Sequence, residues 1–142
     1  MAAGPTVKQI MQTYPGKIRL VIKNYPYKYR DFARIAAEAS LAARDQGKYW
    51  EMHDILISRS PKLDRASLIA YAEELGLDVQ KFTESIDSGK HAKEIERDLK
   101  LAESLDLFNT PTFYINGRQI IGERPFDYFR KIIDEELNQT VR

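Results

Sequence analysis

Residue patterns typical of strands occur only toward the two ends of this chain, and the long stretch between them has helical periodicity. The first strand pattern is Lys17–Asn24, in which Ile18, Leu20 and Ile22 alternate with mostly basic residues. Such alternation predicts a strand with one buried and one exposed face, and lysines suit the edge of a sheet. The second is Thr112–Gly122. We therefore expect an α/β fold whose strands lie far apart in the sequence.

Helical patterns account for most of the remaining chain. Pro5 suits the first turn of a helix, and Pro15-Gly16 ends it. Asp64 and Asp78 are expected to cap two later helices, because an aspartate side chain accepts hydrogen bonds from the free backbone N–H groups of a helix start. The helices expected after the first strand cover 31–46, a segment around 49–56, 64–75, 78–88, 91–105 and a last helix that Pro125 opens.

The C-terminal part predicts a β-hairpin. Thr112-Phe113-Tyr114-Ile115 is a continuous aromatic and β-branched run, as expected of a strand covered on both faces. Asn116-Gly117 is a strong signal for a two-residue hairpin turn, because both residues tolerate positive φ. Arg118–Gly122 would return as the partner strand. No repeat or long linker divides the chain, so residues 1–142 are predicted to form a single domain.

The order of these elements resembles the DsbA-like branch of the thioredoxin superfamily. The resemblance covers nearly the whole chain and is carried by several short segments in the same order: Pro5-Thr6-Val7, 17–26, 36–39, 47–54, 109–117 and Gly122. It implies a thioredoxin-like fold with a large helical insertion, at about residues 31–105, between the first surviving strand and the C-terminal hairpin and helix.

The resemblance also implies parts that these residues do not contain. The family fold begins with a central strand, and a Cys-x-x-Cys motif then starts the first helix. Counting back from Pro5 would place the second cysteine just before Met1. We therefore expect a chain without the first central strand and without catalytic residues. The thiol chemistry itself depends on a cysteine that ionises readily at a helix N-terminus, and no serine, threonine or methionine replaces it.

Thr110 and Pro111 are the candidate substrate-binding residues. They resemble the family's cis-proline loop, whose backbone pairs with an extended substrate peptide, and the resemblance implies a cis Thr110–Pro111 bond. The alternative is a trans proline that merely enters a strand. His53 and His91 are single histidines on different predicted helices, without a second ligand at helical spacing. We accordingly expect no metal and no cofactor.

Composition limits the possible partners. The net charge is +1, with 22 basic and 21 acidic residues, so no nucleic-acid or membrane partner is indicated. No signal peptide is visible at Met1–Pro5, and as it stands the chain would be cytoplasmic, although the resembling family is often periplasmic or exported. The absence of cysteine is compatible with any redox compartment. In the intact family the partners are protein or peptide substrates.

Three functions remain open at this stage. The first is a thiol–disulfide oxidoreductase of the DsbA type, inactive in the present chain for lack of cysteine. The second is a non-catalytic module that binds peptides against Thr110 or serves as a scaffold. The third is a relative of the glutathione-using kappa-class transferases and isomerases, which share the fold and also need an active-site residue at the start of the first helix.

The lack of a central strand also predicts self-association. Its loss would leave backbone groups of Lys17–Asn24 and Thr112–Asn116 without partners, and unpaired buried N–H and C=O groups are costly. A second copy of the chain is the nearest source of a replacement strand. We therefore expect a homodimer, formed by strand pairing or by exchange of the N-terminal segment. The alternative is closure of the gap within one chain.

Overall fold

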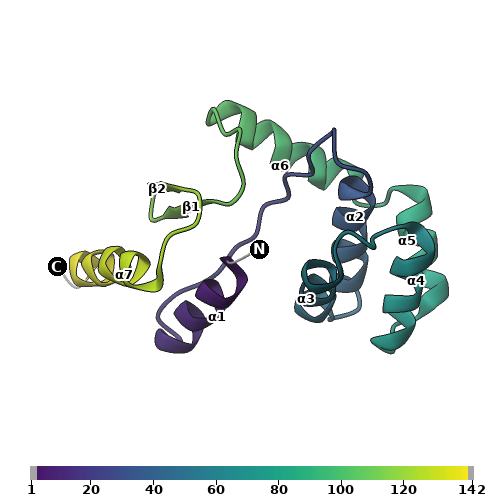
Figure 1. Ribbon diagram of the computed structural model, residues 1–142, viewed down its shortest axis with the longest axis horizontal. Helices are drawn as coiled ribbons and strands as arrows, with labels where there is room; N and C mark the ends of the chain where they lie inside the picture. Colours follow the sequence, from purple (N-terminus) through teal and green to yellow (C-terminus); the bar gives the residue numbers. More distant parts are fainter. Residues whose placement is uncertain (1–2, 141–142) are drawn as a thin grey trace. The chain divides into compact units, whose positions relative to one another are not determined.

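The computed structural model describes residues 3–140, without the side chains of Ala3 and Thr140, so the ends of the chain at Met1, Ala2 and 141–142 lie outside it. Figure 1 shows the elements in chain order. They are α1 (Ala3–Thr13), α2 (Ala33–Arg44), α3 (Tyr49–Arg59), α4 (Arg65–Glu74), α5 (Val79–Ser88), α6 (Ala92–Ser104), β1 (Thr112–Ile115), β2 (Arg118–Ile121) and α7 (Phe126–Thr140).

The described chain divides into two compact units. Unit 1 contains residues 1–22 and 105–142, with α1, the β1–β2 hairpin and α7, and unit 2 contains Lys23–Ser104, with α2 to α6. The predicted helical insertion, at about 31–105, falls almost entirely within unit 2. The prediction that the whole chain forms one domain remains a prediction.

Unit 2 is a helical body built around a closely packed core. Its largest fully buried side chains are Phe82, Met52, Leu68 and Ile95, which come from four different helices. Small alanines on α2 let the neighbouring helices approach closely, and Ala39, Ala42 and Ala43 are at most 1% exposed. Burial of these side chains is the main favourable contribution to folding of this unit.

The ends of the helices in unit 2 follow the sequence signals. Asp64 accepts a hydrogen bond from the backbone N–H of Ser67 at 3.0 Å, and Asp78 accepts one from Lys81 at 3.0 Å. Gly89 ends α5 with a φ of 62°, a left-handed conformation that favours glycine. The two predicted aspartate caps are therefore present as expected.

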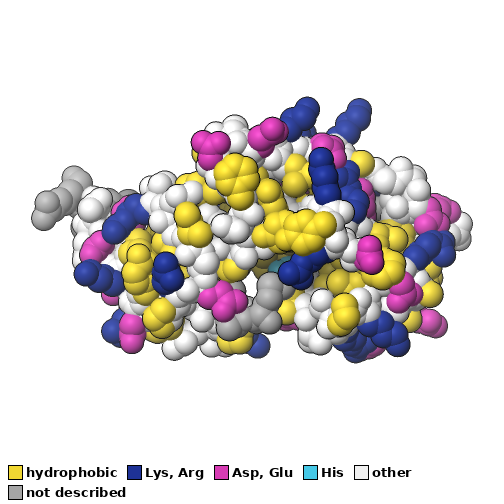
Figure 2. Space-filling model, turned by 45° about the horizontal axis from the view of Figure 1, so that its top comes forward, with side chains coloured by type: hydrophobic (Ala, Val, Ile, Leu, Met, Phe, Trp, Pro, Cys, Tyr) yellow, Lys and Arg dark blue, Asp and Glu magenta, His cyan; other side chains and the backbone are white. Residues whose placement is uncertain are grey.

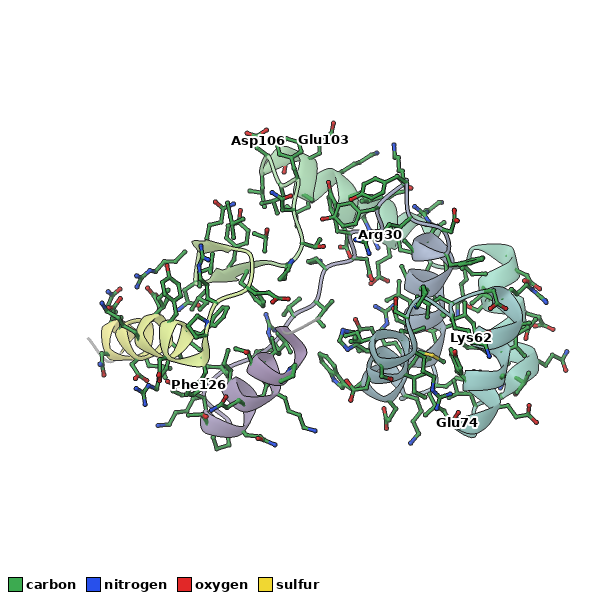
Figure 3. The ribbon with its side chains drawn as sticks, viewed as in Figure 1. Arg30, Lys62, Glu74, Glu103, Asp106 and Phe126 are labelled. Carbon is green, nitrogen blue, oxygen red and sulfur yellow. The ribbon has the colours of Figure 1, made fainter. Side chains whose placement is uncertain are left out.

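Unit 1 packs α1, the hairpin and α7 around a smaller core. Its buried side chains are Ile10, Tyr14, Ile120, Phe129, Ile132 and Ile133. Phe113 and Phe129 meet edge to face, with ring centroids 4.9 Å apart. Tyr14, which directly follows α1, links α1 to α7, because its hydroxyl donates to Asp134 Oδ1 at 2.6 Å. Phe126, labelled in Figure 3, opens α7 and packs against the same core.

The hairpin has the register that the sequence predicts. Thr112 lies opposite Ile121, Phe113 opposite Ile120, and Ile115 opposite Arg118, so the loop consists of Asn116 and Gly117. These two residues have φ values of 47° and 88°, which is the geometry that an Asn-Gly turn provides. The expectation that both faces of β1 are covered is wrong. Phe113 and Ile115 pack on the core, whereas Tyr114 is 41% exposed.

The predicted strand Lys17–Asn24 is not a strand in the structure. Residues 18–27 form no regular element, and the sheet in the described chain contains only β1 and β2. The side chains still alternate, with Ile18, Leu20 and Ile22 half-buried and Lys17 exposed. The physical reason is that a strand needs a hydrogen-bonded neighbour, and in this part of the chain none runs beside it. Alternation therefore predicted the buried face correctly and the pairing incorrectly.

Candidate functional site: the Thr110–Pro111 loop

The candidate site lies between the end of α6 and the start of β1. The chain leaves α6 after Ser104, and Asp106, labelled in Figure 3, adopts a positive φ of 52°. Phe108 follows with its side chain 70% exposed, and Thr110 is also exposed. The peptide bond between Thr110 and Pro111 is cis.

Hydrogen bonds to its flanking residues hold this loop in place. The hydroxyl of Thr112 donates to the backbone oxygen of Asn109 at 2.7 Å, which closes a short turn around Thr110 and Pro111. On the other side, the N–H of Gly122 donates to the backbone oxygen of Pro111 at 2.8 Å. Gly122 has a φ of 78°, which a residue with a Cβ atom rarely adopts. The loop is thus anchored to both strands of the hairpin.

The chemistry that this loop supports is backbone recognition. An exposed segment with fixed direction can exchange hydrogen bonds with an extended peptide, as a strand edge does. The 142 residues contain no cysteine, so they offer no thiolate beside this loop. No group of three or more His, Asp or Glu side chains able to hold a metal occurs among residues 3–140.

Charged side chains reach the surface on many elements, and hydrophobic side chains lie exposed among them (Figure 2). Exposed large hydrophobic residues in unit 1 are Met11, Val21, Leu105, Phe108, Tyr114, Ile121 and Tyr128. Thr112, Tyr114, Gln119 and Ile121 share the face of the hairpin that turns away from the core, and the amide of Gln119 donates to the hydroxyl of Tyr114 at 2.8 Å.

Unit 2 contains a second cluster of ionisable side chains, which the sequence did not reveal. His91 Nε2 lies 2.9 Å from Asp45 Oδ2, and the ammonium group of Lys90 donates to the same oxygen at 2.6 Å. The buried Glu38 accepts a hydrogen bond from the backbone N–H of His91 at 3.2 Å. Asp45 follows α2 and His91 precedes α6, so no local spacing could have predicted their contact.

Electrostatics in this cluster point to a structural role. Burial alone would raise the pKa of Asp45, but the hydrogen bond from Lys90 and the nearby His91 outweigh it and lower that pKa. A surface pocket of about 460 Å³ beside the cluster is lined by Asp45, Lys81 and Lys90 among others. Each lysine is already paired with a carboxylate, Lys90 with Asp45 and Lys81 with Asp78. The cluster joins the end of α2 to the start of α6.

His53, the other histidine, lies on α3 beside Trp50. Its ring centroid is 5.8 Å from that of Trp50 and 5.9 Å from that of Tyr49. The two histidines therefore occupy separate environments within unit 2.

In the described part of the chain, no helix is long and apolar enough to cross a membrane.

Comparisons with known proteins agree with a thioredoxin-like fold. A family model described as Thioredoxin matches residues 2–135. A thioredoxin-like oxidoreductase from Silicibacter pomeroyi is similar at 27% identity and a TM-score of 0.84, over 94% of this chain and 76% of that one. The thiol-disulfide exchange protein alpha-DsbA2 from Wolbachia pipientis is similar at 24% identity and a TM-score of 0.81, over 92% and 71%, which shows a shared fold.

The curated relatives are named as antiporters rather than as thioredoxin-like proteins. A protein of Salinispora tropica named Na(+)/H(+) antiporter NhaA 3 is 37% identical over 121 residues, or 84% of this chain. A Na(+)/H(+) antiporter NhaA of Herminiimonas arsenicoxydans is 40% identical over 105 residues, or 74% of this chain. The chain spans only 18% and 17% of the lengths of these two relatives. The similarity therefore concerns a small part of each larger protein.

Proposed function

Because the chain belongs to the thioredoxin family, we propose that it is a DsbA-type domain of thiol–disulfide exchange whose 142 residues do not carry out the exchange themselves. The observation that carries this proposal is the DsbA-type fold combined with the absence of cysteine. Exchange proceeds by attack of a thiolate on a disulfide, and these residues offer no thiolate. In this proposal the chain contributes the substrate side of the site.

Thr110 and Pro111 are the proposed peptide-binding residues. Thr110 is exposed, and the turn closed by Thr112 and Asn109 fixes the direction of its backbone. Phe108, 70% exposed, offers an apolar side chain next to the same segment. An extended polypeptide that lies along the loop would gain backbone hydrogen bonds and an apolar contact, with little dependence on its sequence.

The exchange part of the proposal is tested with an insulin-reduction assay in the presence of dithiothreitol. The chain as given is expected to reduce insulin at the uncatalysed rate. A fusion that adds a hydrophobic strand and Cys-x-x-Cys before Met1 is expected to gain activity, and the matched control carries Ser-x-x-Ser instead. Catalysis by the cysteine-free chain, or an inactive but folded Cys-x-x-Cys fusion, would contradict the proposal.

The binding part is tested by nuclear magnetic resonance. Titration with a short, unfolded, cysteine-free peptide is expected to shift the amide resonances of Asn109, Thr110 and Thr112. The amide of Glu103, on the last turn of α6, serves as a control and is expected not to move. Saturating peptide without a change at the loop would exclude Thr110 and Pro111 as its binding site.

A second candidate is supported by the names of the curated relatives. Two proteins 37% and 40% identical to this chain are named as antiporters and are several times longer than the matched segment. The chain would then be a thioredoxin-like domain attached to a larger transport protein. Reading the gene in frame beyond both ends of this sequence tests the idea. An adjoining series of long apolar segments would support it, and stop codons at both ends would contradict it.

A further inference from the structure

Helix α6 carries a row of positive charges on the side that faces away from the core of unit 2. Lys93, Arg97 and Lys100 are exposed, and their spacings of four and three residues place them on one face of the helix. The opposite face contains the buried residues of α6, which are Ile95, Asp98 and Ala102. The outer face of α6 is therefore positively charged.

The nearby carboxylates of α6 are already paired with residues of α2. Glu94 forms a salt bridge with Arg44 at 2.6 Å, and Glu96 forms one with Arg34 at 2.7 Å. Among the described residues, the three cations of the outer face form no salt bridge of their own. Their charge is therefore available to a partner from outside the chain.

The turn that leads into α2 adds aromatic side chains and two more cations. Lys28 and Arg30 are exposed, and Tyr29 between them is 76% exposed. The ring of Tyr29 lies against that of Tyr27, with centroids 5.1 Å apart, and the guanidinium of Arg30 lies 5.8 Å from the Tyr27 ring centre. Phe32 is also exposed. Aromatic rings and cations therefore alternate along this turn.

Hydrogen bonds at both ends hold this turn beside α6. Before the turn, the backbone N–H of Asn24 donates to the buried Asp98 at 2.8 Å. After it, the guanidinium of Arg34 donates to Glu96 at 2.7 Å. The hydrogen bond from Arg34 and, to a smaller extent, the charge of Lys28 lower the pKa of Glu96, so Lys28 also lies near α6. The turn and the outer face of α6 belong to one surface of unit 2.

We propose that this surface binds the negatively charged headgroups of a lipid membrane. Each lysine or arginine near an anionic lipid surface strengthens binding about fivefold. Tyrosine rings suit the boundary between headgroups and acyl chains, because one end of the ring is apolar and the other polar. We call this region the cationic surface, and its side chains are Lys28, Tyr29, Arg30, Phe32, Lys93, Arg97 and Lys100.

The net charge of the chain does not reveal the cationic surface. The value of +1 sums 22 basic and 21 acidic residues over all faces, whereas a membrane meets one face only. In the described segments that form the surface, Asp31 and Glu103 are the exposed carboxylates without a salt bridge, and the five cations outnumber them. A membrane partner, which the net charge did not indicate, is therefore consistent with the local distribution of charge.

Two observations favour a membrane over a nucleic acid as the anionic partner. Proteins that bind single-stranded nucleic acids offer open aromatic faces on which bases stack. Here the ring of Tyr27 has Tyr25 at 5.3 Å and Tyr29 at 5.1 Å, so the rings contact one another instead. Leu101, which is 44% exposed on α6, would contact lipid and has no group that reads a base.

Co-sedimentation with lipid vesicles is the first test. The chain is expected to bind vesicles that contain anionic phosphatidylglycerol and not vesicles of phosphatidylcholine alone. Lys100→Gln is expected to weaken binding about fivefold, and Lys93→Gln combined with it about twentyfold. Lys62→Gln is the matched control, because it removes the same charge from an exposed residue between α3 and α4, labelled in Figure 3.

The Lys62→Gln variant is expected to bind as the unmodified chain does. Equal losses in Lys62→Gln and Lys100→Gln would show attraction to the whole chain and overturn the proposal. Equal binding to both kinds of vesicle, or no binding to the anionic ones, would also overturn it. Raising the salt concentration is expected to weaken binding, because ions screen exposed charges.

A fluorescent label at Tyr29 is the second test. The chain has no cysteine, so a dye that brightens in apolar surroundings can be attached to a single Tyr29→Cys site. The dye is expected to brighten with phosphatidylglycerol vesicles and to stay unchanged with a single-stranded oligonucleotide. The same dye at Lys62→Cys is the control and is expected to stay dim. Brightening at both sites, or brightening with the oligonucleotide and not with vesicles, would contradict a membrane contact at the cationic surface.

Discussion

Unit 1 and unit 2 differ in how the backbone N–H and C=O groups of their secondary structure find hydrogen-bond partners. In unit 2, each helix makes its hydrogen bonds internally, and side chains such as those of Asp64 and Asp78 cap the ends. In unit 1, the hydrogen bonds of the sheet join β1 to β2, and residues 18–27 form no regular element. Among the described residues, unit 2 is built from helices alone, whereas unit 1 contains the two-stranded sheet.

The difference shows how the two kinds of secondary structure depend on the rest of a chain. A helix needs residues only four positions away, whereas a strand needs another strand, which can lie anywhere in the sequence or in another molecule. A helix therefore keeps its hydrogen bonds whatever lies beside it, whereas a strand is paired only where another strand runs alongside. The two units are therefore expected to respond differently to mutation and to pH.

The largest effect is expected from the core of unit 2. Phe82 is completely buried, so Phe82→Ala should lower the free energy of unfolding by about 3–5 kcal/mol. Urea denaturation followed by the fluorescence of Trp50, the only tryptophan, measures it. Phe108→Ala is the control, and because Phe108 is 70% exposed its effect should stay within about 0.5 kcal/mol. Equal losses in both variants would contradict the assigned core.

Alkaline pH should weaken unit 1 in particular. Burial of Tyr14, together with its hydrogen bond to Asp134, raises the pKa of its hydroxyl to about 12. A raised pKa favours the protonated form in the folded state, so stability is complete below the ordinary value near 10 and falls as pH rises from there toward 12. The expected loss is about 2 kcal/mol, measured by hydrogen exchange of α7 amides.

Tyr14→Phe provides the control for this pH dependence. The variant keeps the buried ring but has no hydroxyl to ionise. The loss of protection of the α7 amides between pH 10 and 12 should therefore be much smaller in the variant than in the unmodified chain. An unchanged pH profile in Tyr14→Phe would assign the alkaline loss to another group. Tyr49 in unit 2, whose pKa burial also raises, is the group to examine next.

Acid should weaken unit 2, by the smallest of these effects. The pKa of Asp45 is lowered, so its contribution is complete above the ordinary value near 3.8 and is lost as pH falls below it. The side chain is 30% exposed, which limits the change to about 1 kcal/mol or less. Trp50 fluorescence in urea at falling pH measures it, and Asp45→Asn should flatten the curve. A steeper curve in the variant would contradict the assignment.

Several features of the fold could be predicted because their causes are local. The caps at Asp64 and Asp78 need only a carboxylate and the N–H three positions later. The Asn116-Gly117 turn needs only two residues that tolerate positive φ. The caps and the turn each depend on residues that are neighbours in the sequence. The choice of Thr110 and Pro111, which lie directly before β1, came instead from the family resemblance.

The sequence by itself thus determined the helices, the hairpin and the residues that form the exposed loop. Only the tertiary structure decided which of these elements have partners. Lys17–Asn24 has the side-chain pattern of a strand and forms no strand pair in the described chain, and Tyr114 is exposed although its strand is apolar. Asp45 meets His91 across 46 positions. Pairing and long-range contact depend on which segments the fold brings together, and a local pattern contains no record of that.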